Sequence, residues 1–414
     1  MCTNVGCIPS KALIHAAKLK YSAEHGGNIG LDAKISVDFR KTQEWKQGVV
    51  DSLSRGVEQL CRLNQIEIIK GSASFRSSNT IHVNGRTIRF KKAVIATGTT
   101  IRELGHLPYD HERIIDSTDA LSLAEIPEKM VIVGGGYIAV EMADVYLRFG
   151  SKVTVVYRGE NLLKEMDHEI SRLVLEKIRE LGGDVLLKST VEKTEGNVAT
   201  VKTPDGEKKI EFDKLLVAAG RVRNYDGLGL DKTKVQLENN LIKVDETMRT
   251  ADENIFAVGD VVHGPALAHK AFREGKVAAE VIAGRKSAFD NLVPLVVFSY
   301  PPVASVGLTE QQAKEQGIKT KIGKMPFSAS GKAKTMDVKD GFVKIIADEN
   351  HVIIGVHVIG PEATELIAEA TFAMEMAARL EDLALTIHAH PTLPEALAEA
   401  AEAALGQVIH IYRK

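Results

Sequence analysis

The sequence predicts an α/β fold that continues into a C-terminal α+β region, and three observations predict it. The chain has 414 residues, enough for two to four domains at about 150 residues per domain. Residues 129–156 read as a strand, three glycines, a helical segment and a second strand, the pattern of a βαβ unit. From residue 291 onward strands and helices mix without regular alternation, which is typical of an α+β domain.

The other elements follow in order from the hydrophobic pattern. Apolar residues recur every three or four positions over 11–65, which predicts two helices. Short alternating runs over 67–101 predict strands that close on Ala96-Thr97-Gly98, and residues 117–127 make a plausible domain boundary. Further strands are expected up to residue 249, then a strand from 255 into Gly259-Asp260 and a helix over 269–283. The C-terminal part is predicted to hold strands at 303–306, 342–346 and 352–359 and helices at 365–379 and 396–405.

Composition excludes several classes of protein. Apolar residues make up 44% and charged residues 26%, with no run of about 18 apolar residues, so neither disorder nor a membrane span is expected. Lys and Arg number 53 against 55 Asp and Glu, a net charge of −2. No basic stripe is present, which makes nucleic acid an unlikely partner. Three cysteines and the lack of a secretion-signal layout predict a cytoplasmic protein.

Two of the three cysteines, Cys2 and Cys7, stand together in Cys-Thr-Asn-Val-Gly-Cys-Ile-Pro-Ser-Lys. Thiols at this spacing can close a small ring across a helix start, where the helix dipole lowers a thiol pKa toward the reactive thiolate. This pattern indicates a redox dithiol; two free thiols in an exposed terminus are an equally acceptable interpretation of the spacing. Zinc is disfavoured, because no second Cys or Cys/His pair completes four ligands.

The glycine loop Gly134-x-Gly136-x-x-Ala139 follows a strand and opens a helix. Such a turn presents backbone N–H groups and a helix N-terminus to a pyrophosphate. A glycine-rich turn that binds nothing is the alternative. At the end of the second strand, where an acidic residue would bind the ribose of NAD, the chain has Arg158, with Lys164 six residues later. Cations suit a 2′-phosphate, so NADP(H) is favoured over NAD(H) unless both are simply solvated.

Near the C-terminus His390 precedes Pro391, and Glu395 follows five residues after the histidine. A histidine on a rigid turn with a carboxylate to fix its tautomer can act as a general base toward a thiol. The motif by itself is weak, because most lone histidines are structural, and His388 is interpreted as one of these.

Together these segments resemble the flavin-dependent pyridine nucleotide-disulfide oxidoreductases over essentially the whole chain. The resemblance includes the segments at 217–221, 255–260, 268–271 and 303–310 as well as the motifs above. It implies two nested Rossmann-like nucleotide-binding domains, for FAD and NAD(P), plus a C-terminal α+β dimerisation domain. The implied ranges are 1–120 for the first part of the FAD domain, 121–246 for the NAD(P) domain, 247–288 for the second part of the FAD domain and 289–414 for dimerisation.

The resemblance also implies residue roles. Cys2 would exchange with the substrate disulfide and Cys7 would lie against the flavin, beside an ion pair of Lys11 and Glu141. His390, oriented by Glu395, would move the thiol proton in the partner subunit of a homodimer. The remaining implied cofactor residues are Thr97, Gly98, Asp260 and Ala268 for FAD, and Gly134, Gly136, Tyr137, Ile138, Glu141, Arg158, Lys164 and Gly220 for NAD(P).

The implied substrate is a small dithiol or disulfide, or a lipoyl group, and the identity of the substrate stays open, as does membership of a 2-oxo acid dehydrogenase complex. The basic pair at Arg158 and Lys164 departs from the members that oxidise dihydrolipoamide, which leaves an NADPH-dependent reductase of a low-molecular-weight disulfide or of mercuric ion as an alternative. Tyr300-Pro301-Pro302 stands where Asp-Pro-Glu is more usual. The chain also starts after the expected first glycine turn for FAD, so a truncated, inactive dimerising fragment is a further alternative.

Overall fold

The computed structural model describes residues 1–412, which form two compact units. Unit 1 comprises Met1–Ser54, Glu103–Ala219 and the chain from Pro294 on, and unit 2 comprises Arg55–Arg102 and Gly220–Val293. Both units mix helices and strands, and the chain has the α/β class predicted from its sequence. No helix within residues 1–412 has the length and apolar character needed to cross a bilayer.

Unit 1 begins with α1 (Cys2–Val5), α2 (Cys7–Glu24) and α3 (Phe39–Leu63), the last of which continues past the unit boundary at Ser54. Its first sheet is parallel and has the order β6-β13-β7-β8-β9. The bounds of its elements are β6 (Ile114–Ile115), α4 (Ser117–Ala120), β7 (Lys129–Val133), α5 (Tyr137–Phe149), β8 (Lys152–Val156), α6 (His168–Glu180), β9 (Asp184–Leu186) and β13 (Lys214–Val217).

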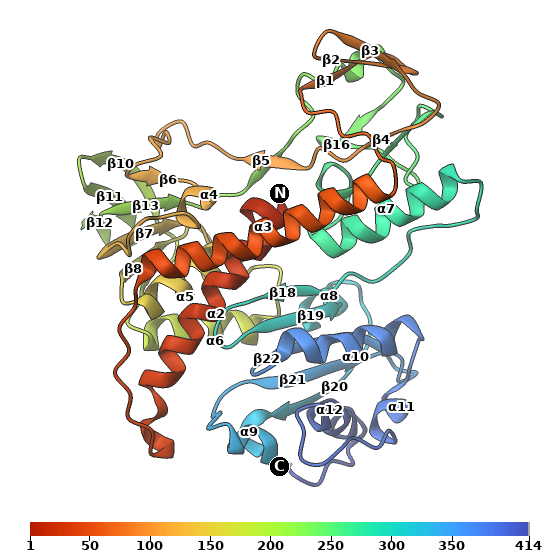
Figure 1. Cartoon of the computed structure of the whole chain (residues 1–414). Helices are drawn as coiled ribbons and strands as arrows, with labels where there is room; N and C mark the ends of the chain where they lie inside the picture. Colours follow the sequence, from red (N-terminus) through yellow and green to blue (C-terminus); the bar gives the residue numbers. More distant parts are fainter. Residues whose placement is uncertain (413–414) are drawn as a thin grey trace. The chain divides into compact units, whose positions relative to one another are not determined.

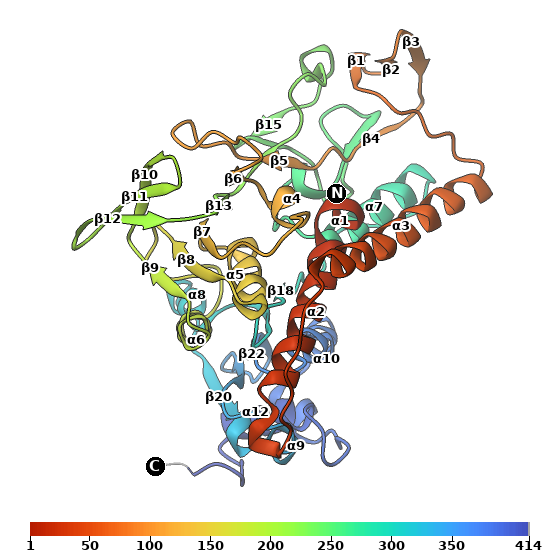
Figure 2. The ribbon, with the colours of Figure 1, turned by 60° about the vertical axis from the view of Figure 1, so that its left-hand side comes forward.

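The parallel sheet is buried on both faces, which explains the continuous apolar runs in its strands. Met130, Val131 and Ile132 of β7 are each at most 1% exposed. Helices α2 and α5 pack against each other on this core (Figures 1 and 2). An antiparallel sheet of β10 (Thr190–Glu195), β11 (Val198–Thr203) and β12 (Gly206–Glu211) lies beside β13 in both views (Figures 1 and 2).

The C-terminal part of unit 1 is an antiparallel sheet of order β18-β19-β22-β21-β20. Helix α10 packs on β19 and β22, and α12 packs on β20 and β21. The contact between α12 and β20 is close because both sides carry small residues: a Cβ added at Gly323 would meet the Ala400 carbonyl oxygen. The bounds are β18 (Leu295–Val297), β19 (Val303–Gly307), α8 (Glu310–Glu315), β20 (Lys321–Pro326), α9 (Gly331–Thr335), β21 (Phe342–Ala347), β22 (Ile353–Ile359), α10 (Ala363–Glu375), α11 (Leu380–Ala384) and α12 (Glu395–Leu405).

Unit 2 contains short strands, as the alternating pattern over 67–101 predicts. An antiparallel sheet β1-β2-β3 is followed by a parallel pair, β4 with β17, and by two antiparallel pairs, β5 with β14 and β15 with β16. The bounds are β1 (Ala73–Ser77), β2 (Thr80–Val83), β3 (Arg86–Arg89), β4 (Ala93–Ile95), β5 (Thr99–Ile101), β14 (Arg221–Arg223), β15 (Leu237–Glu238), β16 (Leu241–Ile242), β17 (Ile255–Ala257) and α7 (Ala268–Ile282).

Candidate redox site and nucleotide-binding loop

The two N-terminal cysteines form a disulfide, Cys2–Cys7, with a Cα–Cα distance of 4.7 Å. Cys2 is the first residue of α1 and Cys7 is the first residue of α2, and Gly6 separates the two helices. Both cysteines are half-buried, so an external thiol can reach the bond. Once the disulfide is reduced, the position of Cys7 at the N-terminus of an 18-residue helix favours its thiolate form.

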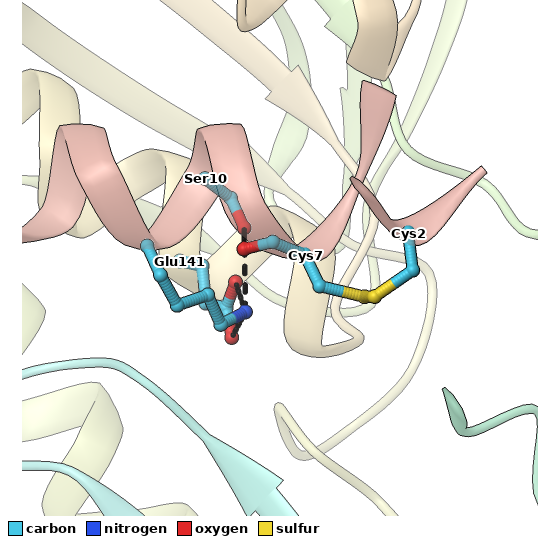
Figure 3. Close-up of a disulfide and its surroundings, with 5 residues drawn as sticks. Cys2, Cys7, Ser10 and Glu141 are labelled. Atoms are coloured by element: carbon cyan, nitrogen blue, oxygen red, sulfur yellow. Dashed lines mark hydrogen bonds and ion pairs between the residues drawn. A yellow bond between two sulfur atoms is a disulfide. The ribbon is translucent and has the colours of Figure 1, made fainter. Parts of the chain in front are cut away.

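An ion pair lies one helical turn beyond Cys7. Lys11 Nζ is 3.0 Å from Glu141 Oε1 and 2.9 Å from Oε2, and the Glu141 side chain is 4% exposed. The backbone N–H of Phe298 also donates to Glu141 Oε1, at 3.1 Å. Ser10 links this pair to the cysteine, since Ser10 Oγ donates to the Cys7 carbonyl and accepts from Lys11 Nζ. Figure 3 shows Ser10 and Glu141 on the Cys7 side of the disulfide.

The glycine loop lies between β7 and α5, and two of its three glycines have a steric reason. Gly134 has φ 147°, and a Cβ there would sit 2.4 Å from the Ala218 carbonyl oxygen; a Cβ at Gly135 would strike the ring of Tyr157. Gly136 faces open space, and as N-cap of α5 it offers no capping side chain. The loop can therefore take a pyrophosphate against its N–H groups. Ala218, which closes one side of the loop, is a residue that the sequence reasoning missed.

The first turn of α5 completes this loop. Tyr137 is 40% exposed, Ile138 packs partly on the core, and Ala139 is fully buried. The small side chain of Ala139 allows the helix to approach the sheet closely, which is the role of the third position in the dinucleotide-binding pattern.

The two cations after β8 differ in their surroundings. Arg158 is exposed and has no ion-pair or hydrogen-bond partner within residues 1–412. Lys164 is exposed and lies 3.5 Å from Glu165. The nearby Glu160 pairs with Lys188 at 2.8 Å, and this contact holds the pKa of Glu160 below its usual range. Arg158 is thus the cation that is not already engaged by a carboxylate.

His390 and Glu395 form a pair at the start of α12. His390 Nδ1 is 2.8 Å from Glu395 Oε1, and the His390 side chain is 78% exposed. Burial acts to raise the pKa of Glu395, but the hydrogen bonds from the Thr392 N–H and from His390 outweigh it and lower that pKa. The carboxylate thus stays ionised and holds Nδ1 of the ring, and Nε2 has no hydrogen-bond partner among the described residues. His388 instead binds Glu369 and the Thr386 carbonyl, consistent with a structural residue.

The other predicted flavin residues lie in unit 2. Arg221 donates to Thr99 Oγ1 at 2.7 Å and Thr99 donates in turn to Asp260 Oδ2 at 3.0 Å. Asp260 is half-buried, and its other oxygen has no hydrogen-bond partner within the described residues. That oxygen can accept a hydrogen bond from a hydroxyl group of a bound flavin. Arg221 and Thr99 are positioning residues for Asp260, and sequence reasoning assigned them no role.

Four further residues of the prediction flank this chain of hydrogen bonds. The Thr97 and Gly98 carbonyls accept from Asn224, and Gly98 has φ 67°. Ala268 opens α7, where Glu274 accepts from the Gly259 N–H at 2.7 Å and so fixes the turn before Asp260. Gly220 has φ 114°. It lies in unit 2, and its assignment to NAD(P) binding stays a prediction.

Comparisons with known proteins agree with this arrangement. Residues 1–275 match the family model described as pyridine nucleotide-disulphide oxidoreductase, and residues 293–401 match the model of the dimerisation domain of that family. The chain is 46% identical to a dihydrolipoyl dehydrogenase of Geobacillus stearothermophilus and 42% identical to one of Haloferax volcanii, each alignment covering at least 99% of this chain and 90% of the relative.

Solved structures give the same result. The chain superposes with a TM-score of 0.89 and 26% identity on LpdA from Mycobacterium tuberculosis, covering 97% of this chain and 90% of that one. For the HOCl-induced flavoprotein disulfide reductase RclA from Escherichia coli the TM-score is 0.85 and the identity 28%, with coverages of 97% and 90%. These matches confirm the resemblance drawn from the sequence motifs.

Proposed function

The chain belongs to the pyridine nucleotide-disulphide oxidoreductase family, and we propose that it exchanges electrons between a dithiol of the lipoyl class and NADP(H), with Cys2 and Cys7 as its redox pair. It is an FAD-dependent disulfide oxidoreductase of the dihydrolipoyl dehydrogenase type. The observation that carries the proposal is the accessible Cys2–Cys7 disulfide one helical turn from the Lys11–Glu141 pair.

The thiol chemistry balances as a two-electron exchange. A thiolate of the reduced substrate attacks Cys2 Sγ, the Cys2–Cys7 bond breaks, and Cys7 leaves as a thiolate stabilised by the N-terminus of α2. The second substrate thiol then attacks the mixed disulfide, so that the substrate leaves as a disulfide and Cys2 as a thiol. His390 takes the proton of the first attacking thiol and releases it to solvent, then takes the proton of the second thiol and passes it to Cys2 Sγ as Cys2 leaves; Glu395 stabilises the ring while it is charged.

A homodimer in which His390 serves the active site of the partner subunit is part of this proposal. Support comes from the dimerisation-domain match over residues 293–401 and from the exposed ring of His390. An apolar group of Phe372, Met376, Leu385 and Ile387, which are 67% to 97% exposed, lies in the same C-terminal segment. Exposed apolar groups of this kind mark protein–protein contacts.

The residues present fit a flavin. When bound, FAD accepts two electrons from the dithiol side and passes them to the nicotinamide side. Lys11 would hold the flavin ring with Glu141 as counter-ion. The Asp260 oxygen that has no partner among the described residues would accept a hydrogen bond from the ribityl chain. Thr99 and Arg221 would keep that carboxylate in place. Thr97, Gly98 and Ala268 would form the backbone around it.

The nucleotide is proposed to be NADP(H) in preference to NAD(H). Gly134 and Gly136 would hold the pyrophosphate. Arg158, which pairs with no carboxylate in the described part of the chain, would bind the 2′-phosphate with the help of Lys164. Tyr137, Ile138 and Glu141 would line the path toward the nicotinamide.

The domain ranges that the family resemblance implies for this sequence remain part of the proposal.

The decisive experiment is an anaerobic absorbance titration of the purified 414-residue protein. We expect a flavin spectrum that dihydrolipoamide reduces, and that NADPH reduces faster than NADH. A flavin spectrum that responds to neither dithiol nor nucleotide would refute the proposal. A colourless protein would show that the 414 residues by themselves do not retain FAD, which is the result expected for an inactive fragment.

An NADPH-dependent reductase of a low-molecular-weight disulfide is the second candidate, and the unpaired Arg158 favours it. The same preparation distinguishes the two functions. If NADPH-driven reduction of a small disulfide such as oxidised glutathione is much faster than oxidation of dihydrolipoamide, the second function is correct. The reverse ranking supports the lipoyl class, including a lipoyl group carried on a 2-oxo acid dehydrogenase complex.

A further inference from the structure

Phe298, the first residue after β18, contacts both members of the Lys11–Glu141 pair. Its ring centroid lies 4.4 Å from Lys11 Nζ, and its backbone N–H donates to Glu141 Oε1 at 3.1 Å. A cation over an aromatic face is attracted to the ring, and the attraction grows as water is excluded. The Lys11 side chain is 31% exposed and Phe298 is half-buried, so the ring covers part of the ammonium group.

The segment that carries Phe298 is fixed to α2 and α5 two residues further on. Tyr300 donates its backbone N–H to Asp144, and its ring centroid lies 4.1 Å from the central carbon of the Arg148 guanidinium. The Arg148 side chain is 0% exposed, and its Nε donates to Asp144 Oδ1 at 2.9 Å. The ring of Tyr21, on α2, lies 4.1 Å from the same guanidinium carbon. Packed side chains therefore set the position of Phe298.

Lys11 lies on the same face of α2 as Cys7. The two residues are four positions apart in this helix, a spacing that makes their side chains neighbours. Lys11 Nζ also donates to Ser10 Oγ at 3.3 Å, and Ser10 Oγ donates to the Cys7 carbonyl at 3.0 Å. A lysine cation beside a thiol stabilises the thiolate. The place at which the ammonium group is held therefore affects the reactivity of Cys7.

Glu141 alone would offset the charge of Lys11, because Lys11 Nζ lies 3.0 Å and 2.9 Å from its two carboxylate oxygens. Phe298 acts against this on both sides of the pair. Its backbone N–H stabilises the negative charge on Glu141 Oε1, and its ring attracts Lys11 without carrying a charge that would cancel that of the ammonium group.

We propose that Phe298 is a positioning residue of the redox site, whose ring holds Lys11 Nζ where it stabilises the Cys7 thiolate. One residue at the end of β18 thus contacts both charges that lie beside the redox cysteine. The inference rests on the proposed redox role of Cys7, and it depends neither on the nucleotide nor on the substrate.

The test is the rate at which iodoacetamide alkylates Cys7, measured as a function of pH in the purified 414-residue protein carrying Cys2→Ser. This substitution keeps Cys7 as a free thiol, and mass spectrometry follows the N-terminal peptide. The thiolate is the reacting form, so the rate reports the ionised fraction of Cys7. Cys61, the free cysteine on α3, is alkylated in the same sample and serves as the internal reference.

This readout requires neither bound flavin nor turnover. A protein that fails to react with dihydrolipoamide and with both nucleotides would refute the proposed function, whereas the alkylation rates would still decide the role of Phe298.

Phe298→Leu removes the ring but keeps an apolar side chain and the backbone N–H. It should slow alkylation of Cys7 at neutral pH about twofold to fivefold, the factor that corresponds to a partly exposed cation–π contact, and leave Cys61 unchanged. Phe298→Tyr keeps a ring and should restore the rate. Phe342→Leu is the matched control, because it removes a ring 5.1 Å from Lys324 Nζ, and it should not alter the rate at Cys7.

Lys11→Met decides whether Phe298 acts through Lys11. By itself this variant should slow Cys7 at least as much as Phe298→Leu does, and adding Phe298→Leu to it should have no further effect, because the cation that the ring holds is gone. A further fall of the same size in the double variant would overturn the proposal. The same conclusion would follow from an unchanged Cys7 rate in either single variant, or from a Phe298→Tyr variant as slow as Phe298→Leu. A parallel change at Cys61 would indicate a general loosening of the structure and would also overturn it.

Discussion

Replacement of Arg158 by alanine tests the proposed nucleotide preference most directly. Arg158 is exposed and has no carboxylate partner among the described residues, so its guanidinium is free to make a two-point contact with a 2′-phosphate. A charge-assisted hydrogen bond contributes about 1.5–3 kcal/mol, and exposure to solvent places this one at the lower end. A loss of about 1.5 kcal/mol corresponds to a drop of about tenfold in kcat/KM for NADPH.

The structure also predicts an asymmetry between the two cations. Lys164 is 73% exposed and already lies beside Glu165, so its contact with a phosphate is that of a surface pair, below about 1 kcal/mol. Lys164→Ala should therefore lower kcat/KM for NADPH less than about fivefold. Neither variant should change kcat/KM for NADH, which has no 2′-phosphate.

The assay is steady-state nucleotide oxidation with NADPH and NADH in parallel at two ionic strengths. The NADPH/NADH ratio should fall in Arg158→Ala, and the effect should shrink at higher salt because the contact is exposed. Lys188→Ala, which removes a nearby cation that pairs with Glu160, is the matched control and should leave the ratio unchanged. An unchanged ratio in Arg158→Ala, or an equal fall in both nucleotides, would refute the reasoning.

Four further predictions concern other parts of the chain. Arg158→Glu with Lys164→Ala should shift the preference toward NADH, because the carboxylate repels a 2′-phosphate and accepts from a ribose hydroxyl; an unaltered ratio of rates would contradict it. Cys7→Ser should abolish the long-wavelength charge-transfer absorbance that appears on two-electron reduction, because the thiolate that donates to the flavin is lost. If this band persists in an anaerobic spectrum of the variant, Cys7 does not face the flavin. Gly134→Ala should destabilise the loop by about 1–3 kcal/mol, since φ is 147° and the added Cβ would meet the Ala218 carbonyl oxygen; unchanged thermal stability and NADPH affinity would argue against this strain. Lys344→Met should lower stability by about 3–5 kcal/mol, because Lys344 is 3% exposed and pairs with Asp167 and Glu169; a melting temperature equal to that of the unmodified protein would contradict it.

The sequence alone determined the features whose physics is local. The glycine loop, the helix that follows it and the strands on either side depend on hydrophobic periodicity and on glycine within about thirty residues. Cys2 and Cys7 are five residues apart, and His390 and Glu395 are also five apart, so a single turn or helix start brings each pair together. Such short-range patterns predict both the elements and the chemistry of the residues within them.

Only the tertiary structure decided the features that join distant segments. Arg221 reaches Thr99 across 122 positions, and local periodicity does not specify which side chains meet once helices and sheets pack. The Lys11–Glu141 pair, 130 positions apart, was expected only through the family resemblance and not from periodicity. Arg148 illustrates the same limit, because its burial between Tyr21 and Tyr300 depends on the packing of α2 and of a loop from the C-terminal sheet against α5. Burial and the count of satisfied hydrogen bonds are properties of the packed molecule, so the burial of the Arg148 guanidinium could not be predicted from residue order.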